Sequence, residues 1–572
     1  MLTCKQIALS LILLLTLSSC SEQKENAINN NATSTLQNSA IEDNNLTLNN
    51  NNASIEDSNN TRVDSNTTES NTTIAPTIPI KEEPISVLIP QTAIEEPIVT
   101  PQPEPVLPTP SAFNIVDETT YVQSTCTPLL SESVTGYFAS PTGRANALGT
   151  LQDPLALQNA IGENSPLQAG DKLWLLEGLY SGAFVSKIRG TSALPIQIRP
   201  LRNARVVLDG RGSNASALRI DGQWVEYYGL EIASSSTARV SQERGSSPSD
   251  ISGNSGMTIF AANTLVANCI IHDNLGGGIS SWRTSGEANS ELYGNIIYNN
   301  GWTAPDRGHG HAIYIQNRSG YKKMTNNIIF FGFATGIHAY TEGGQINNFD
   351  IEENVWFMTG ASDPRSSQKK DNCLVGGFQP VKNLLLKNNI GYSENGRGTR
   401  IGYGGSVVGQ DAVLENNYLS ENFWVAGEWD SLTLSNTTIL RGRTGSSQSF
   451  VTDLGDNTFE EQPPVSGKKV FVQANAYDPL RARVAIFNND EDDTIDVDLS
   501  AILQEGEAYR VHSVFDLFGA PMFSGVYDGN LVAFSMGSVT PPQPRGMIDG
   551  IEESDDPHKR FGVFIVTHGG CQ

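Results

Sequence analysis

Four of the seven histidines in this 572-residue chain fall within about 70 residues, a spacing that can bring proton-transfer groups together. They are His272, His309, His311 and His338, and Tyr314 lies among them. A neutral imidazole can accept a proton near pH 7, and a tyrosine hydroxyl can deliver one to a leaving oxygen. These residue types therefore point to general acid–base catalysis.

Cationic side chains accompany the histidines, although the whole chain is acidic. The formal net charge is −25 and the isoelectric point is about 4.7, which argues against nucleic acid as a partner. A local group of cations suits a polyanionic sugar, because uronate carboxylates need cations and sugar faces need aromatic rings. The cations expected in loops near the histidines are Arg283, Arg307, Arg318, Lys322, Lys323, Arg365, Lys369 and Lys370.

Removal of the proton beside a uronate carboxylate requires a cation, a base and an acid. The cation neutralises the carboxylate, the base reaches C5, and the acid meets the leaving oxygen. We predict His338 or His311 as the base, Tyr314 as the acid, and Arg307 or Arg283 as the neutralising cation. The other predicted substrate contacts are Trp282, Gln316, Tyr340, His309 and Arg365.

A recurring asparagine phrase indicates the scaffold that positions these residues. Its repeated asparagines are Asn295, Asn327, Asn354, Asn389 and Asn417, spaced 32, 27, 35 and 28 residues apart. Repeats of this length contain only two or three short strands and must stack to bury their apolar faces. An inward asparagine at each bend can bond the backbone of neighbouring coils. An earlier copy carries Cys269 at the asparagine position.

Alignment of one strand from each coil predicts which side chains face outward. Because alternate residues of a strand point to opposite faces, Ser280, Tyr314 and His338 should form one outward row. Stacked strands lie about 4.8 Å apart, so Tyr314 and His338 should be direct neighbours. The predicted inward rungs are Ile279, Ile313, Ile337, Ile401 and Val425, then Ser281, Ile315 and Ala339, and the next outward row is Trp282, Gln316 and Tyr340.

Three further phrases carry a resemblance to a known fold: a Gly170-Asp171 start, then Pro195-Ile196-Gln197-Ile198 and Leu208-Asp209-Gly210. They resemble the first coils of secreted right-handed parallel β-helix proteins of the pectin lyase-like superfamily. The resemblance covers roughly 113–445 and implies an all-β fold. The His, Tyr and Arg pattern is similar to that of β-helix polysaccharide lyases and alginate C5-epimerases. It implies cleavage of an acidic polysaccharide by β-elimination, although Asp363-Pro364-Arg365 only partly matches the Asp-Pro-His phrase of the epimerases.

Composition divides the remainder of the chain. Residues 1–20 read as a signal peptide whose Leu17-Ser18-Ser19-Cys20 ending resembles the lipobox of bacterial lipoproteins. This resemblance implies a lipid on Cys20 and a place in the bacterial cell envelope, and Ser21 favours the outer membrane. Residues 21–112 form an Asn/Ser/Thr-rich and then Pro-rich tether that we expect to be disordered. Residues 446–572 should form an antiparallel β-sandwich, and we expect a monomer.

Several alternatives remain open at the level of sequence. A glycoside hydrolase on the same fold would need a carboxylate pair, for which Asp306, Glu342 and Asp350 are candidates. The same acids, or the acidic run 488–493, can hold Ca²⁺, whereas no other cofactor is indicated. A non-catalytic carbohydrate-binding or adhesive surface protein is the third alternative. His272 aligns with Tyr298 and Phe330, which favours a stacking role. The cysteines after Cys20 offer a Cys126–Cys571 disulfide and buried thiols at Cys269 and Cys373.

Overall fold

The computed structural model describes residues 134–202, 204–282, 288–363, 370–394, 397–404, 407–442, 451–547 and 557–568. The predicted signal peptide with Cys20, the tether, Cys126, Cys571, Arg283 and Arg365 lie outside the described residues. No helix within these ranges has the length and apolar character needed to cross a membrane. The one α-helix they contain is α1 (Leu157–Ile161).

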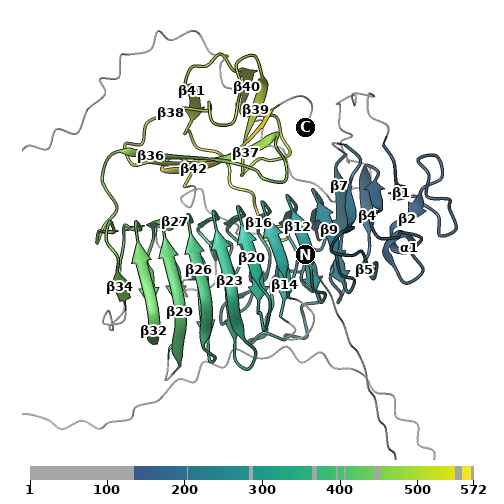
Figure 1. Ribbon diagram of the computed structural model, residues 1–572, viewed down its shortest axis with the longest axis horizontal. Coiled ribbons are helices and arrows are strands. Elements are labelled where there is room, and N and C mark those ends of the chain that lie inside the picture. Colours follow the sequence, from purple (N-terminus) through teal and green to yellow (C-terminus); the bar gives the residue numbers. More distant parts are fainter. Residues whose placement is uncertain are drawn as a thin grey trace, which may run out of the picture. The chain divides into compact units, whose positions relative to one another are not determined.

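Three parallel sheets form the first part of the described chain, and successive coils add one strand to each sheet (Figure 1). The first sheet runs, in spatial order, β2 (Leu155–Ala156), β1 (Tyr137–Ser140), β3 (Lys172–Leu175), β6 (Ile196–Pro200), β9 (Val225–Tyr228), β12 (Thr264–Ala267), β15 (Ser290–Tyr293), β20 (Lys322–Thr325), β23 (Ile346–Glu352), β26 (Val381–Lys387), β29 (Val408–Glu415), β32 (Glu428–Ser435) and β34 (Val451–Asp453).

The other two parallel sheets follow the same coil order in reverse. The second sheet contains β35 (Thr458–Phe459), β33 (Thr438–Ile439), β30 (Tyr418–Ser420), β27 (Ile390–Tyr392), β24 (Val355–Phe357), β21 (Ile328–Phe330), β16 (Ile296–Tyr298), β13 (Ile270–His272), β10 (Glu231–Ala233), β7 (Val206–Asp209) and β4 (Gly178–Ser181). The third sheet contains β31 (Phe423–Val425), β28 (Thr399–Ile401), β25 (Cys373–Gly377), β22 (Ile337–Thr341), β19 (Ile313–Ile315), β14 (Ile279–Ser281), β11 (Met257–Ile259), β8 (Leu218–Ile220) and β5 (Phe184–Ser186).

The asparagine phrase forms the bend between the first and second sheets. The residue before each ladder position often takes a positive φ, as at Asn326 (57°) and Asn388 (55°), which a short polar side chain tolerates. The following amide is buried and bonds both neighbouring coils. The Asn327 Nδ2 donates to the Leu292 carbonyl at 2.9 Å and to the Asn354 Oδ1 at 2.9 Å. The predicted asparagine ladder is therefore confirmed, and the Cys269 N–H donates to the Asn295 Oδ1 at its first step.

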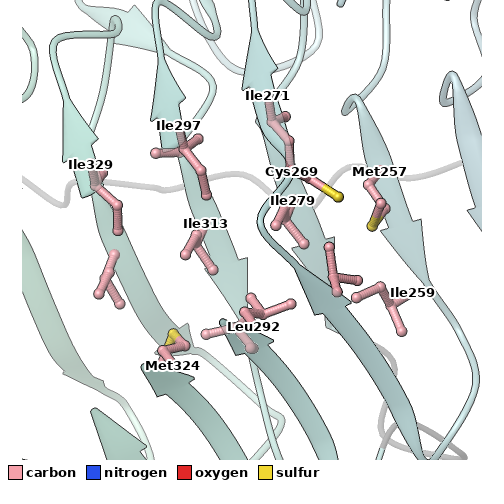
Figure 2. Close-up of a cluster of buried hydrophobic side chains, with 14 of the residues drawn as sticks. Met257, Ile259, Cys269, Ile271, Ile279, Leu292, Ile297, Ile313, Met324 and Ile329 are labelled. Atoms are coloured by element: carbon pink, nitrogen blue, oxygen red, sulfur yellow. The ribbon is translucent and has the colours of Figure 1, made fainter. Parts of the chain in front are cut away.

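Apolar side chains from all three sheets fill the interior, as Figure 2 shows for Ile279, Ile297, Ile313 and Leu292. Full burial of one such side chain contributes about 1.5–3 kcal/mol, so a stack of them gives the coils much of their cohesion. Cys269 and Cys373 are free thiols in this interior, as predicted.

The predicted inward rung needs one correction. Ile279, Ile313 and Ile337 do stack, but Ile337 next pairs with Cys373. Ile401 and Val425 instead continue the rung of Ala339, through Val375. The sequence alignment omitted the Cys373–Gly377 strand and so placed the last two strands out of register by two residues.

Parallel pairing continues through β34 and β35, past the limit near 445 expected from sequence. An antiparallel part follows. Its five-stranded sheet has the order β36 (Lys468–Ala474), β37 (Arg481–Asn488), β42 (Phe561–His568), β39 (Ala508–Ser513) and β40 (Phe523–Val526), and β38 (Thr494–Val497) pairs with β41 (Val532–Ser535).

The antiparallel part shares an apolar cluster with the second sheet. The rings of Tyr392 and Phe561 stack with centroids 4.7 Å apart, and Tyr418 meets Phe487 at 4.8 Å. The outer face of the second sheet is thus buried by the C-terminal sheet. The outer face of the third sheet carries the candidate site.

Candidate active site

Tyr314 and His338 are neighbours on the outer face of the third sheet, as the sequence predicted. The register pairs Ser280 with Tyr314 and Tyr314 with His338. The alternating residues Ile313, Ile315 and Ala339 belong to the core, so Tyr314 and His338 point outward. Their ring centroids lie 5.5 Å apart.

His311 joins this pair from the segment before β19. Its ring centroid lies 3.9 Å from that of His338 and 5.8 Å from that of Tyr314. We call His311, Tyr314 and His338 the His/Tyr cluster. The Nδ1 atoms of both histidines are buried and have no hydrogen-bond partner among the described residues. Buried polar atoms are normally bonded, so these two nitrogens are unusual and suit a group that meets a reactant.

Both histidines of the cluster are neutral at ordinary pH. Burial lowers the pKa of His311 from 6.5 to about 3, and the charges of Lys370 and Arg307 lower it further. Burial also lowers the pKa of His338 well below 6.5, with contributions from His311 and Arg400. A neutral imidazole carries a lone pair, so each ring is in the protonation state that a general base requires.

Three cations surround the cluster. Arg307 donates through Nη2 to the Ser246 hydroxyl at 2.9 Å. Burial lowers the pKa of Lys370, and the nearby Asp363 opposes that effect. Arg400 lies in the outward row of His338, two strands further along, and was missed because of the register error described above. Its Nη2 binds the Asp371 carboxylate at 2.8 Å, while its buried Nε has no partner in the part of the chain described.

The cationic loop predicted from sequence is smaller than expected. Lys322 was placed there wrongly, because it is buried on β20 and its ammonium donates to the hydroxyls of Ser281 (2.9 Å) and Ser290 (3.2 Å). Lys323 belongs to the first sheet, in register with Asp350. Of the remaining predicted cations, Arg283, Arg365 and Lys369 lie outside the described residues.

Aromatic rings extend the site along the third sheet. Tyr340 is 4 % exposed and stacks on His338, with centroids 4.7 Å apart and planes 7° apart. Tyr340 also meets Tyr403 at 5.1 Å. Gln316 lies beneath, and its Nε2 donates to the Tyr340 carbonyl at 3.1 Å, which makes it a support for the aromatic ring. Trp282 is 40 % exposed at the other end of the row.

His309 occupies a separate position at the edge of the site. It lies on β18 (Gly308–His309), which pairs antiparallel with β17 (Trp302–Thr303). Its ring stacks on Trp302 at 4.1 Å, and its Nε2 is 3.7 Å from the Asp306 carboxylate. Burial and the charge of Arg307 lower the pKa of His309 to about 4. These contacts place His309 beside the cation Arg307, and its ring makes no stacking contact with the His/Tyr cluster that we observe in the described chain.

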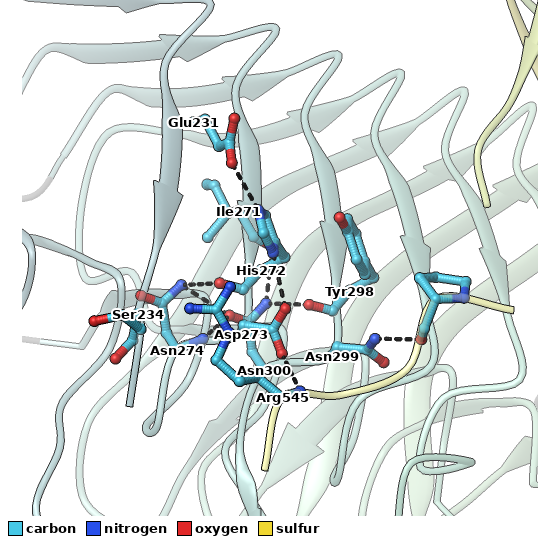
Figure 3. Close-up of polar contacts among 12 residues, drawn as sticks. Glu231, Ser234, Ile271, His272, Asp273, Asn274, Tyr298, Asn299, Asn300 and Arg545 are labelled. Carbon is cyan, nitrogen blue, oxygen red and sulfur yellow. Dashed lines mark hydrogen bonds and ion pairs between the residues drawn. The ribbon is translucent and has the colours of Figure 1, made fainter. Parts of the chain in front are cut away.

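His272 is structural, as its alignment predicted. It stacks on Tyr298 with centroids 4.9 Å apart, on the outer face of the second sheet. Figure 3 shows its ring between Glu231 and Asp273, at 3.2 Å and 3.0 Å. Burial alone would lower the pKa of His272, but the hydrogen bonds to Asp273 and Glu231 outweigh it and raise the pKa. Arg545 also bonds Asp273 there, so His272 helps to hold the C-terminal segment.

Within the described residues, no group of three or more His, Cys, Asp or Glu side chains could hold a metal ion. The acids considered for a hydrolase pair or a calcium site are not gathered together. Asp350 lies on β23 of the first sheet, whereas Asp306 lies in the turn between β17 and β18 and faces Arg307 at 3.9 Å.

A family model described as the right handed beta helix region matches residues 205–367. The chain therefore has a right-handed β-helix. Solved structures with a similar backbone include the pectate lyase Pel9A, at 14% identity and a TM-score of 0.37 over 58% of this chain and 81% of that one. An alginate lyase from Paenibacillus sp. str. FPU-7 is 17% identical, with a TM-score of 0.32 over 53% of this chain and 96% of that one.

A GH136 lacto-N-biosidase from Eubacterium ramulus is also similar, at 13% identity and a TM-score of 0.33 over 57% of this chain and 67% of that one. No curated protein matches the sequence. Because right-handed β-helices carry lyases and glycosidases alike, the reaction has to be inferred from the chain's own side chains.

Proposed function

We propose that this chain is a lyase that cleaves an acidic, uronate-containing polysaccharide by β-elimination at the His/Tyr cluster. The observation that carries the proposal is the stacking of two neutral imidazoles, 3.9 Å apart, beside a tyrosine and among cations. Aromatic rings next to the cluster suit the faces of sugar rings, and the cations suit carboxylates.

The proposed step needs no group beyond those in the site. Arg307, Lys370 or Arg400 neutralises the uronate carboxylate and stabilises the charge that develops when C5 loses its proton. An imidazole of His338 or His311 takes that proton. The electron pair forms the C4–C5 double bond, and the bond between C4 and the glycosidic oxygen breaks. Tyr314 delivers a proton to the departing oxygen, which leaves as the new chain end.

The low pKa of the free histidines fits this scheme because the substrate is an anion. The charges of Arg307 and Lys370 lower the pKa of His311, and Arg400 lowers that of His338. A carboxylate bound to these cations offsets their charge and raises the pKa of the nearby imidazoles. The base would thus become stronger when the substrate is in place.

Two other functions make different demands on the site. A glycosidase needs two carboxyl groups on opposite sides of the bond, but Asp371 is bound to Arg400 and Asp306 faces Arg307. An adhesive protein needs the aromatic rings but has no use for two buried imidazole nitrogens without partners. The elimination accounts for both features.

The test is an assay of the purified chain against a panel of uronate polymers, with ultraviolet absorbance for unsaturated ends and a reducing-end assay in parallel. Unsaturated product that is lost in His338→Ala and Tyr314→Phe supports the lyase. New reducing ends without unsaturation would indicate a hydrolase. Binding without turnover on every polymer would indicate the non-catalytic protein.

We further propose that Cys20 anchors the chain in the cell envelope, where the polymer arrives from outside. The support is the Leu17-Ser18-Ser19-Cys20 sequence. Several acyl chains anchor stably, because each buried CH₂ group contributes about 0.8 kcal/mol. Labelled palmitate should enter the wild-type chain and not Cys20→Ser. Equal labelling of both would contradict the proposal.

A further inference from the structure

The outward row that carries Tyr340 loses its side chains on the next two coils. Tyr340 pairs with Gly376, and Gly402 and Ala426 follow in the same position. These glycines are required by the close backbone approach of successive coils. A Cβ at Gly376 would lie 2.5 Å from the Gly402 backbone, and Gly402 has a φ of 81°. The third sheet is therefore hollow beside Tyr340.

This hollow encloses about 220 Å³ and is open to solvent. Ligand pockets usually measure about 300–1,000 Å³, so this space fits one sugar ring and not two. Its floor is glycine backbone, which lets a ligand approach the sheet closely. The side chains around it include Gln379, Val381, Tyr403, Val407 and Trp429.

One aromatic ring separates the hollow from the His/Tyr cluster. Tyr403 lines the hollow and contacts Tyr340 edge to face, at 5.1 Å and 63°. Tyr340 in turn stacks on His338. A ring seated in the hollow would therefore be close to a neighbouring ring over the cluster.

A cation stands beside the hollow. The Arg400 guanidinium lies 4.9 Å from the Tyr403 ring centroid, and Arg400 belongs to the outward row next to Gly402. Its side chain is 15 % exposed, and its Nε is without a partner among the described residues. An uncommitted N–H donor of a guanidinium is a suitable partner for a carboxylate.

We propose that the hollow over Gly376, Gly402 and Ala426 is a subsite for a single uronate ring, seated against Tyr403 with its carboxylate at Arg400. This inference rests on the proposed function, because it assumes that the polymer runs from the His/Tyr cluster across Tyr340. It adds that the substrate carries a uronate, and not only a neutral sugar, at this position.

The probes are oligosaccharides of galacturonate, mannuronate, guluronate and glucuronate of increasing length, each with a carboxyl-reduced counterpart. Calorimetry uses the full chain with Tyr314→Phe, so that bound probes are not consumed. Tyr403→Ala removes an aromatic face, and Val407→Trp fills the space. Each should weaken binding of the best uronate probe roughly tenfold, the scale of one lost aromatic contact. Phe459→Ala, an exposed ring on β35 of another sheet, should leave it unchanged.

Arg400→Gln separates the charge from the shape of the subsite. It should weaken the uronate probe but not its carboxyl-reduced counterpart, which should bind wild-type Arg400 more weakly. Unchanged affinity in Tyr403→Ala and Val407→Trp would overturn the subsite, even where the polymer assay shows unsaturated product. Conversely, hollow-dependent binding with no elimination of any polymer would retain the subsite and refute the lyase. Equal loss of both probes in Arg400→Gln would overturn the assignment of the carboxylate.

Discussion

The imidazoles of His311 and His338 lie 3.9 Å apart although 26 residues of chain separate them, and neither Nδ1 has a hydrogen-bond partner in the described structure. The intervening residues complete the coil that brings β22 beside β19. A second histidine close to the first lowers its pKa, and Arg400 adds to the effect. The pair is thus held neutral next to cations, a costly arrangement for a purely structural site.

Tyr314→Phe keeps the ring and removes only the hydroxyl. Loss of a general acid should lower kcat by about 10²- to 10⁴-fold, with little change in substrate binding. Turnover of the best uronate polymer is the measurement, with binding of its oligosaccharides as a second readout. Tyr321→Phe, at an exposed ring before β20, is the matched control and should behave as wild type. Undiminished turnover in Tyr314→Phe would remove that hydroxyl from the reaction.

The pH dependence of activity should reflect the low pKa of the histidines. Only the neutral imidazole accepts a proton, and a histidine with the ordinary pKa of 6.5 would lose activity below that pH. Because the folded pKa of His338 is lower, the acid limb of kcat/KM should lie below 6.5. Arg400→Gln removes one depressing charge and should move this limb to higher pH. An acid limb at or above 6.5 in the wild type would contradict the neutral-base assignment.

Stability should show the same histidines. Burial holds the pKa of His309 at about 4 and that of His311 at about 3, below their unfolded value of 6.5. The unfolded chain therefore binds protons that the folded chain does not, and stability falls as pH decreases below 6.5. His311→Gln should lose less of its Tm between neutral and acid pH than the wild type. An identical or larger acid loss in His311→Gln would count against a buried neutral His311.

Asn354 tests the ladder that sets the coils in register. Its Nδ2 donates to the Met324 carbonyl and the Asn389 Oδ1, and its Oδ1 accepts from the Asn327 N–H. Asn354→Ala leaves buried groups unpaired, each costing about 1–3 kcal/mol. Denaturant unfolding should show a clear loss of stability relative to Asn214→Ala, which lies on the surface. Equal stability of the two variants would mean that the ladder contributes little.

Sequence was sufficient for the scaffold because its signals are local and repeated. The asparagine phrase marks the same bend in each coil, and strand alternation then places Tyr314 and His338 on one face. Lys322 was also predictable from alternation, since it shares the face of the buried Met324. Its charge suggested a loop, and the two interior hydroxyls that accept its protons come from distant positions in the chain.

Arg400 and the hollow were not predictable, because both depend on a coil with no regular signature. Cys373–Gly377 has neither the asparagine phrase nor an isoleucine at the rung position, so the register after it was ambiguous. The stacking of His311 on His338 is also beyond strand alternation, since His311 precedes β19. Such contacts depend on how a bend folds back over the sheet.

The central claim is that a histidine of this cluster removes the C5 proton of a uronate. It is tested most directly with a cleavable uronate polymer that carries deuterium at C5. The account predicts slower turnover than with the unlabelled polymer, loss of the C5 deuterium from the product, and no such reaction in His338→Ala with His311→Ala. Cleavage that leaves deuterium on C5, or that persists in the double variant, would contradict it.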